Sequence, residues 1–130
     1  MIVQKLYPVT ESARGSIEEY NEIVPVENLM GVHLDYALAL LMPFDIVILE
    51  HIGGLRPVCV QVETKSEKRS WSPSSNEEHA REVLNQFGLP VDQGPSREAL
   101  EDALRKNTAP AVKIPILASH DVASPYSKQV

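Results

Sequence analysis

The chain has 130 residues, the size of a single domain with one hydrophobic core. Its hydrophobic content of 43% and charged content of 23% are ordinary for a soluble globular protein. The longest apolar run, residues 37–42, is far shorter than a membrane span, and the single Cys59 excludes an internal disulfide and a thiolate zinc cluster. A net charge of −6 argues against a large nucleic-acid-binding surface. The chain begins without a basic segment leading into an apolar one, so we expect a cytoplasmic protein.

The first third of the sequence predicts a strand or arm followed by helices. Residues 1–9 are apolar enough to pack as an arm or short strand. Ser16-Ile17-Glu18-Glu19 has the form of a capping box and predicts a short helix that Pro25 ends, with residues 23–26 as a short strand in the alternative. Residues 29–42 have helical spacing, with one apolar face, and Pro43 ends that helix. This face consists of Leu34, Ala37, Leu38 and Leu41.

A β-hairpin is predicted at the centre of the chain. Residues 46–49 form a continuous apolar run, which is typical of a strand covered on both faces. Gly53-Gly54 supplies a turn, and residues 58–62 form the return strand. Alternation places Val58, Val60 and Val62 on one face of this strand and Cys59, Gln61, Glu63 and Lys65 on the other.

The rest of the chain predicts a loop, two helices and an edge strand. Residues 66–76 are polar and rich in turn formers. A second capping box, Ser75-Asn76-Glu77-Glu78, opens a helix through about Phe87, and Gly88 ends it. Residues 96–106 predict a third helix, and residues 112–117 a last strand that its proline confines to an edge. We expect a single domain over residues 1–130 with a loose tail over 118–130. The predicted fold class is therefore α/β, with a central mixed sheet around the hairpin and helices flanking it.

The open end of the hairpin carries residue types that phosphodiester chemistry uses. Asp45 precedes one strand, and Glu63 and Lys65 end the other. Two carboxylates on adjacent strands can hold Mg²⁺ or Mn²⁺, which activates a bound water, and a lysine two residues further on can orient that water. A further acid from a neighbouring helix often completes such a site, and the candidates are Glu18, Glu19 and Glu22.

The strand register decides whether these groups meet. Opposite residues in an antiparallel pair have numbers with a constant sum. A three-residue loop over residues 53–55 gives a sum of 108 and places Asp45 opposite Glu63, whereas a four-residue loop gives 107 and places them on opposite faces. The sequence is compatible with both registers, and a metal site requires the even sum.

Asp45, separated by seventeen intervening residues from Glu63-Thr64-Lys65, resembles the PD-(D/E)xK nuclease superfamily, which has a restriction-endonuclease-like fold. The stretches 44–48 and 56–63, with the later Asn85-Gln86-Phe87-Gly88-Leu89-Pro90-Val91, are also similar to small uncharacterised bacterial nuclease-like domains. The resemblance implies a magnesium-dependent endonuclease that hydrolyses DNA, with Asp45 and Glu63 as metal ligands and Lys65 as the catalytic lysine. It also implies a possible homodimer or larger assembly. Some members of the superfamily have lost catalysis, so the resemblance equally permits an inactive binding or assembly module of a phage, mobile-element or defence system.

Each candidate residue also has a simpler interpretation. Lys68, Arg69 and Trp71 can contact a nucleic-acid backbone and stack on a base, or form a solvated loop with one packed tryptophan. Asp45 can simply start a turn, and Glu63 and Lys65 can be solvent-facing residues at a strand end. A third hypothesis is then an unrelated small α/β interaction protein in which the motif arises by chance.

Overall fold

The structure is a computed structural model, and it describes residues 2–6, 18–52, 56–89, 96–108, 110–118 and 126. The turn at residues 53–55, the segment from Pro90 and most of the C-terminal tail lie outside these ranges. Within them, none of the helices is long and apolar enough to cross a bilayer.

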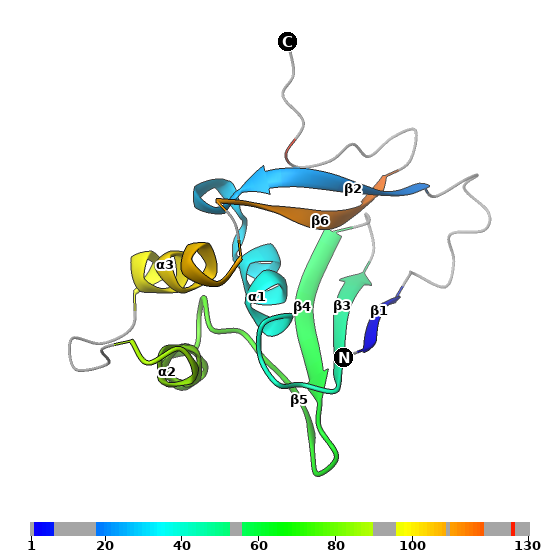
Figure 1. Cartoon of the computed structure of the whole chain (residues 1–130). Coiled ribbons are helices and arrows are strands. Elements are labelled where there is room, and N and C mark those ends of the chain that lie inside the picture. Colours follow the sequence, from blue (N-terminus) through cyan, green and yellow to red (C-terminus); the bar gives the residue numbers. More distant parts are fainter. Residues whose placement is uncertain are drawn as a thin grey trace.

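A four-stranded mixed sheet forms the centre of the described part. Its order is β1 (Ile2–Leu6), β3 (Ile46–Ile52), β4 (Arg56–Glu63) and β5 (Lys68–Ser70). β1 runs parallel to β3, and the β3–β4 and β4–β5 pairs are antiparallel. A separate antiparallel pair joins β2 (Glu18–Pro25) to β6 (Ala111–Ala118) above one end of this sheet (Figure 1). The predicted mixed α/β class and the central β3–β4 hairpin are confirmed.

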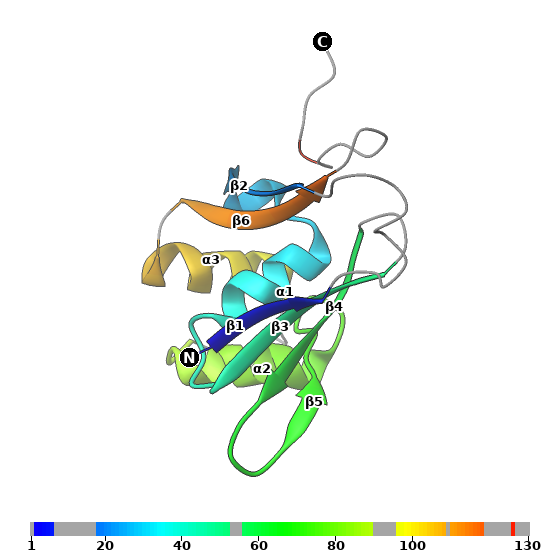
Figure 2. The same cartoon turned by 90° about the vertical axis from the view of Figure 1, so that its right-hand side faces the viewer.

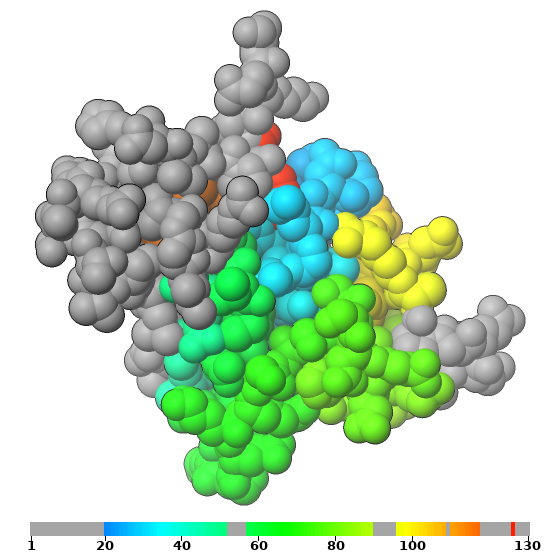
Figure 3. All heavy atoms as spheres, turned by 180° about the vertical axis from the view of Figure 1, so that it is seen from behind, coloured from blue at the N-terminus to red at the C-terminus, as the bar shows by residue number. Residues whose placement is uncertain are grey.

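The helices lie on one side of the four-stranded sheet. They are α1 (Gly31–Ala39), α2 (Glu77–Gln86) and α3 (Arg97–Asn107), and a short 3₁₀ turn, η2 (Val26–Asn28), precedes α1. Figure 2 views the sheet from the side opposite these helices, so the strands lie in front of them. In Figure 3, which shows the back of the molecule, α3 in yellow adjoins the blue η2–α1 region, with α2 in green below. The predicted flanking helices are therefore present on one face of the sheet.

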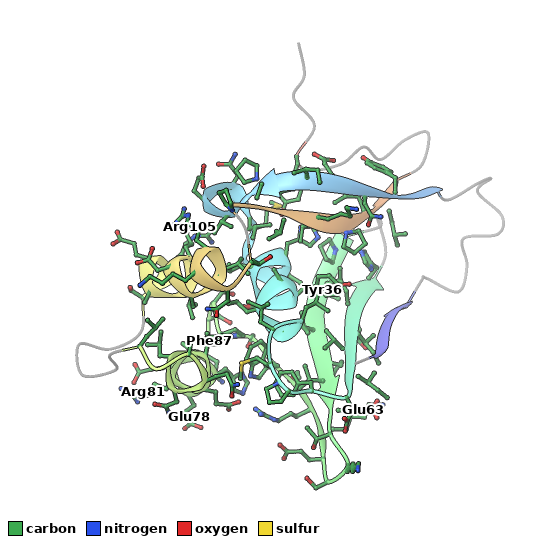
Figure 4. The ribbon with its side chains drawn as sticks, viewed as in Figure 1. Tyr36, Glu63, Glu78, Arg81, Phe87 and Arg105 are labelled. Carbon is green, nitrogen blue, oxygen red and sulfur yellow. The ribbon has the colours of Figure 1, made fainter. Side chains whose placement is uncertain are left out.

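The core lies between α1 and the inner face of the sheet. Val47 and Leu49 of β3 and Val60 and Val62 of β4 are buried on this face. In α1, all residues from His33 to Ala39 are buried, because the helix is enclosed by the sheet, α3 and β6. Tyr36 lies between α1 and the sheet in Figure 4. Because α1 is buried on nearly every side, its apolar side chains are not confined to one face of the helix.

Two local predictions are wrong. Residues 18–25 form β2 and not a helix, because every residue of β2 has a partner in β6, from Glu18 opposite Ala118 to Pro25 opposite Ala111. Tertiary pairing outweighs the local capping-box signal. Residues 68–70, predicted as loop, form β5, in which Arg69 pairs with Val62.

α2 and α3 begin within one residue of their predicted starts, whereas α1 is shorter than the predicted helix over residues 29–42. The side chain of Asn76 accepts a hydrogen bond from the His79 N–H (3.2 Å) and begins α2, and Ser96 does the same for Ala99 (3.2 Å) at the start of α3. Gly88 has a φ of 67° directly after α2. β6 pairs with β2 alone among the described strands, so the predicted edge position of the proline-containing strand is confirmed.

Candidate functional site

The β3–β4 pair changes register once, and this change decides the geometry at its open end. Near the turn, Ile52 pairs with Arg56 and the residue numbers sum to 108. The register shifts between Glu50 and His51, and from the Glu50–Cys59 pair onward the sum is 109. Val58 has no partner in this ladder and is 45% exposed, as expected of the extra residue in a β-bulge.

Glu63 therefore pairs with Ile46. The register with an even sum, which would pair Glu63 with Asp45 and which the metal site requires, does not extend to the open end. The physical reason is Glu50. An even sum throughout would place Glu50 on the core face with Val60 and Val62, at the cost of burying a carboxylate. The bulge leaves Glu50 opposite Cys59 on the outer face and aligns Val47 with Val62 inside.

Asp45 and Glu63 are nevertheless neighbours through their backbones. Asp45 lies one residue before β3, and its N–H donates to the Glu63 carbonyl oxygen at 2.8 Å. Its side chain is exposed. The Glu63 carboxylate, at the lower end of β4 in Figure 4, lies 3.7 Å from the Lys68 Nζ. Asp45 itself is outside the paired residues, whose last pair is Ile46 with Glu63, so the ladder does not align the Asp45 and Glu63 side chains.

Lys65 lies beyond the end of β4. β4 ends at Glu63, and residues 64–67 turn the chain into β5, with the Thr64 N–H donating to the Glu67 carbonyl at 2.8 Å. The Thr64 hydroxyl also accepts from the Ser66 and Glu67 N–H groups. The expectation that Lys65 shares a strand face with Glu63 is therefore wrong, because the strand alternation stops before it.

The candidates for a further metal ligand, Glu18, Glu19 and Glu22, lie in β2 and not on a helix. β2 belongs to the two-stranded sheet, at the opposite end of the molecule from the β4–β5 turn (Figures 1 and 2). The structure does not bring this strand to the open end of the hairpin. A donor set of two carboxylates suits Mg²⁺, but the strand register does not pair Asp45 with Glu63, which the predicted metal site required.

The three residues considered for nucleic-acid contact do not form an exposed basic and aromatic surface. Trp71 is fully buried, with its ring edge-on to Phe44 at a centroid distance of 5.1 Å, so it is not available for base stacking. Arg69 makes two hydrogen bonds to Glu82 (2.9 and 3.2 Å) and one to Glu67 (3.0 Å). Lys68 is exposed and pairs with Glu63. The interpretation as a surface segment with one packed tryptophan fits this arrangement.

Glu82 connects these residues to α2. Its carboxylate also accepts from the indole N–H of Trp71 at 3.3 Å. Burial raises the pKa of Glu82, but the hydrogen bonds and charge of Arg69 outweigh this effect, so the pKa is lowered and Glu82 remains ionised at neutral pH. The ion pair therefore orders β5 against α2.

A cavity of about 400 Å³ opens beside the hairpin end. Apolar side chains of residues 42–44 and polar side chains of Thr64 and α2 line it. The lining residues are Met42, Pro43, Phe44, Thr64, Glu82, Asn85 and Gln86. Phe44 and Thr64, which line the cavity, are the sequence neighbours of Asp45 and Glu63. Its described lining residues include neither lysine nor arginine.

The sequence analysis did not identify a buried polar pair that joins α1 to the turn before α2. Asp35 is buried and accepts two hydrogen bonds from Ser74, from the N–H at 2.7 Å and from the hydroxyl at 3.0 Å. Burial raises the pKa of Asp35 to about 6, and the two Ser74 hydrogen bonds limit this rise. A methyl group at Gly31 would lie 3.2 Å from the Ser74 hydroxyl, so a glycine permits this close approach. The sequence signal for this pair was a charged residue, Asp35, within the largely apolar helical segment of residues 29–42.

A second missed group is on the outer face of the sheet. The Cys59 thiol donates to Glu50 Oε1 at 2.7 Å, and the Gln61 amide lies 3.8 Å from the sulfur. Burial, followed by the hydrogen bond and negative charge of Glu50, raises the pKa of Cys59 to about 11. The thiol is therefore protonated at neutral pH, which does not favour a nucleophilic or metal-ligating role.

Histidine, cysteine, aspartate and glutamate side chains do not gather in groups of three or more with metal-binding geometry within the described ranges. Comparisons of the chain with protein-family models, curated proteins and solved structures find no match.

Proposed function

We propose that this chain is a non-catalytic, nuclease-like module that binds or assembles with a protein partner. The observation that carries the proposal is the pairing of Glu63 with Ile46, one residue away from the register that a two-carboxylate site needs. Lys65 lies in the following turn, and the Glu63 carboxylate is near Lys68. These features support a module that does not carry out the predicted catalysis.

The charge distribution favours a protein partner over a nucleic acid. Nucleic-acid binding depends on arginine and lysine side chains that are free to neutralise phosphates. In the described helices and in β5, each arginine is paired with carboxylates: Arg69 with Glu67 and Glu82, Arg81 with Glu77, Arg97 with Glu101, and Arg105 with Glu27, Glu101 and Asp102. Figure 4 shows Arg81 and Arg105 on the outer sides of α2 and α3. The chain as a whole carries a charge of −6.

The resemblance to nuclease-like domains retains support at the level of element order. A mixed sheet with a core hairpin is followed by α2, which ends at Gln86 shortly before Gly88-Leu89. The resembling domains have in this place a helix ending in glycine, leucine or isoleucine, and proline. A restriction-endonuclease-like fold is therefore part of the proposal.

One observation favours the second candidate, a magnesium-dependent DNA endonuclease. The hydrogen bond from the Asp45 N–H to the Glu63 carbonyl joins the backbones of the two acids, and an open cavity is lined by Phe44 and Thr64, the residues next to them in the chain. In this case Asp45 and Glu63 would hold Mg²⁺ or Mn²⁺. The metal supplies an activated water, and Lys65 would orient that water by donating to it from the turn.

Metal titration and DNA cleavage separate the two candidates. For the binding module, calorimetry with Mg²⁺ and with Mn²⁺ gives no heat of specific binding, and supercoiled and single-stranded DNA stay intact with either metal. The matched variants are Asp45→Asn and Glu77→Gln, since Glu77 is an exposed acid at the start of α2 that does not line the cavity beside the hairpin end. Cleavage that Asp45→Asn abolishes and Glu77→Gln leaves unchanged would establish the endonuclease instead.

Binding to DNA is tested by its salt dependence. A module specific for protein binds DNA weakly, and the logarithm of the association constant changes little with the logarithm of salt concentration. A steep slope that decreases on Lys68→Gln would contradict the proposal, because it would show a phosphate contact at β5. Sedimentation over a range of concentrations then distinguishes self-assembly from a requirement for another protein.

A further inference from the structure

A second cavity, of about 210 Å³, is bounded by the C-terminal ends of α1 and α3 and by the start of β6. Most of its described lining is apolar, and a threonine and a lysine complete it. The described lining residues are Ala37, Leu40, Leu41, Leu104, Thr108, Ala111, Val112 and Lys113. Cavities that hold drug-sized molecules are typically about 300 to 1,000 Å³. This smaller cavity therefore suits a single aliphatic side chain.

Lys113 is the charged residue of this described lining. Its side chain is exposed, and none of the ion pairs among the described residues involves it. The arginines of α3, Arg97 and Arg105, are by contrast paired with acids. An apolar cavity with an unpaired ammonium group at its rim is complementary to a ligand that has an aliphatic body and a carboxylate.

The helix ends beside the cavity do not cancel the charge of Lys113. The last carbonyl groups of an α-helix carry partial negative charge. Two of those in α1 accept the N–H groups of Leu41 and Met42. The last turn of α3 carries Arg105 and Lys106, basic residues that offset its dipole. The ammonium group of Lys113 thus remains the dominant charge at the rim.

The backbone of Lys113 offers a second donor. The β2–β6 ladder is regular, and at its end the Val26 N–H donates to the Pro110 carbonyl at 2.9 Å. Hydrogen-bonded pairs alternate along an antiparallel ladder, so Val112 directs its N–H toward β2 and Lys113 directs its N–H away from β2. β6 lies between β2 and the helices in Figures 1 and 2, so the Lys113 N–H points to the side on which α1 and α3 lie. A carboxylate there can accept from this N–H and from the ammonium group.

The surface next to Lys113 favours a peptide over a small free acid. Ile23 of β2 stands opposite Lys113 in the ladder and is 63% exposed. Side chains of directly opposite residues lie on the same face of a sheet, so Ile23 continues the apolar surface past the lysine. A peptide has further side chains that can cover Ile23, whereas a free aliphatic acid ends at its carboxylate.

We propose that this cavity binds the C-terminal residue of a protein partner, an aliphatic residue whose side chain enters the cavity and whose carboxylate is held by Lys113. The inference rests on the proposed function, since it names the part of the protein partner that is recognised. The net charge of −6 makes two copies of the chain repel each other, so we expect a different protein as the partner.

The test is NMR titration of the full ¹⁵N-labelled chain with three probes. The first is an N-acetylated hexapeptide of glycine and serine that ends in leucine with a free carboxylate, the second is its C-terminal amide, and the third is hexanoate. We expect the free-carboxylate peptide to give saturable shifts at the Leu41, Leu104 and Lys113 amides. The amidated peptide should bind roughly tenfold more weakly or less, because it lacks the charge that Lys113 recognises. Hexanoate should bind more weakly than the peptide.

Three variants identify the groups involved. Lys113→Gln should weaken binding of the free-carboxylate peptide roughly tenfold and remove its preference over the amide. Lys106→Gln, at an exposed lysine of α3 outside the described lining, is the matched control and should bind as the unaltered chain does. Ala111→Phe fills the cavity and should abolish binding. Lys113→Gln changes an exposed side chain, so its result is decisive even if Ala111→Phe perturbs the fold.

Four outcomes would overturn this inference: no shifts at the cavity with the free-carboxylate peptide, equal affinities for the peptide and its amide, equal losses in Lys113→Gln and Lys106→Gln, or hexanoate binding as tightly as the peptide. Self-association that Lys113→Gln abolishes would also overturn it, because a second copy would then occupy the cavity. Each of these results leaves a protein partner at another surface in place. DNA cleavage that Asp45→Asn abolishes would instead refute the proposed function, and Asp45 is not in the described lining of this cavity.

Discussion

The carboxylate of Asp35, buried in α1, accepts both the N–H and the hydroxyl of Ser74, at 2.7 and 3.0 Å. Ser74 is in the turn that leads into α2, so this pair fixes α1 against the start of another helix. Together with the contacts of Arg97 to the Leu29 carbonyl and of Tyr126 to Met30, it holds α1 to three separate segments.

Replacement of Asp35 by asparagine tests the cost of this buried charge. The pKa of Asp35 is raised to about 6, so the folded state binds the proton more tightly than the unfolded state, with its ordinary value of 3.8. The resulting stability is present below pH 3.8 and is lost as the pH rises through 6. We expect Asp35→Asn to be more stable than the unaltered chain above pH 6, by about 1 to 3 kcal/mol.

Asp35→Ala provides the contrast in the same urea-unfolding series. Asparagine can still accept the Ser74 N–H and donate to its hydroxyl, whereas alanine leaves both groups without this partner. We expect the alanine variant to lose about 1 to 2 kcal/mol at pH 7. Equal stabilities for the two variants would show that the Ser74 hydrogen bonds contribute nothing.

The Glu82 carboxylate is expected to stabilise the fold through Trp71 and Arg69. Glu82→Ala removes the acceptor of the indole N–H and of two guanidinium hydrogen bonds, and it should cost about 1 to 2 kcal/mol in urea unfolding. Glu77→Ala, which breaks the exposed ion pair with Arg81 on the same helix, should change stability by less than about 0.5 kcal/mol. If both variants lost similar amounts of stability, Glu82 would contribute only its charge on the helix, and its hydrogen bonds to Trp71 and Arg69 would contribute nothing.

The β-bulge predicts opposite outcomes for two valines of β4. Val60 is buried against Leu49, so Val60→Ala should cost about 2 kcal/mol through lost burial and a residual cavity. Val58, the unpaired and exposed residue, should tolerate the same change within about 0.5 kcal/mol. A large loss at Val58 in thermal or urea unfolding would contradict its assignment as the bulged position.

Cys59 is expected to react slowly with thiol reagents. A pKa of about 11, against an ordinary value of 9.0, lowers the thiolate fraction roughly 100-fold at pH 8. Alkylation by iodoacetamide, followed by mass spectrometry, should be slower than in the urea-unfolded chain by at least that order. Glu50→Gln removes the nearby charge and should accelerate the reaction, and an unchanged rate would show that burial alone protects the thiol.

Much of the fold is encoded locally. The apolar runs and the glycine turn predict the β3–β4 hairpin, and Asn76, Ser96 and Gly88 mark helix ends within about one residue of where the structure has them. These features depend on hydrogen bonds and backbone angles within a few residues, which is why sequence reasoning identified them. The strands β2 and β5 are exceptions, and for β2 the reason is that its partner β6 lies about ninety residues away.

The candidate site depended on information that the local sequence does not contain. The run of residues 46–49 is apolar at every position, so it is compatible with either face of the sheet. The sequence by itself determined a mixed α/β domain built on a hairpin, with Asp45 and Glu63 at its open end. Only the tertiary structure decided that Ile46 stands opposite Glu63, because the ladder shifts by one residue at the bulge around Val58, and the shifted register keeps the Glu50 carboxylate on the outer face.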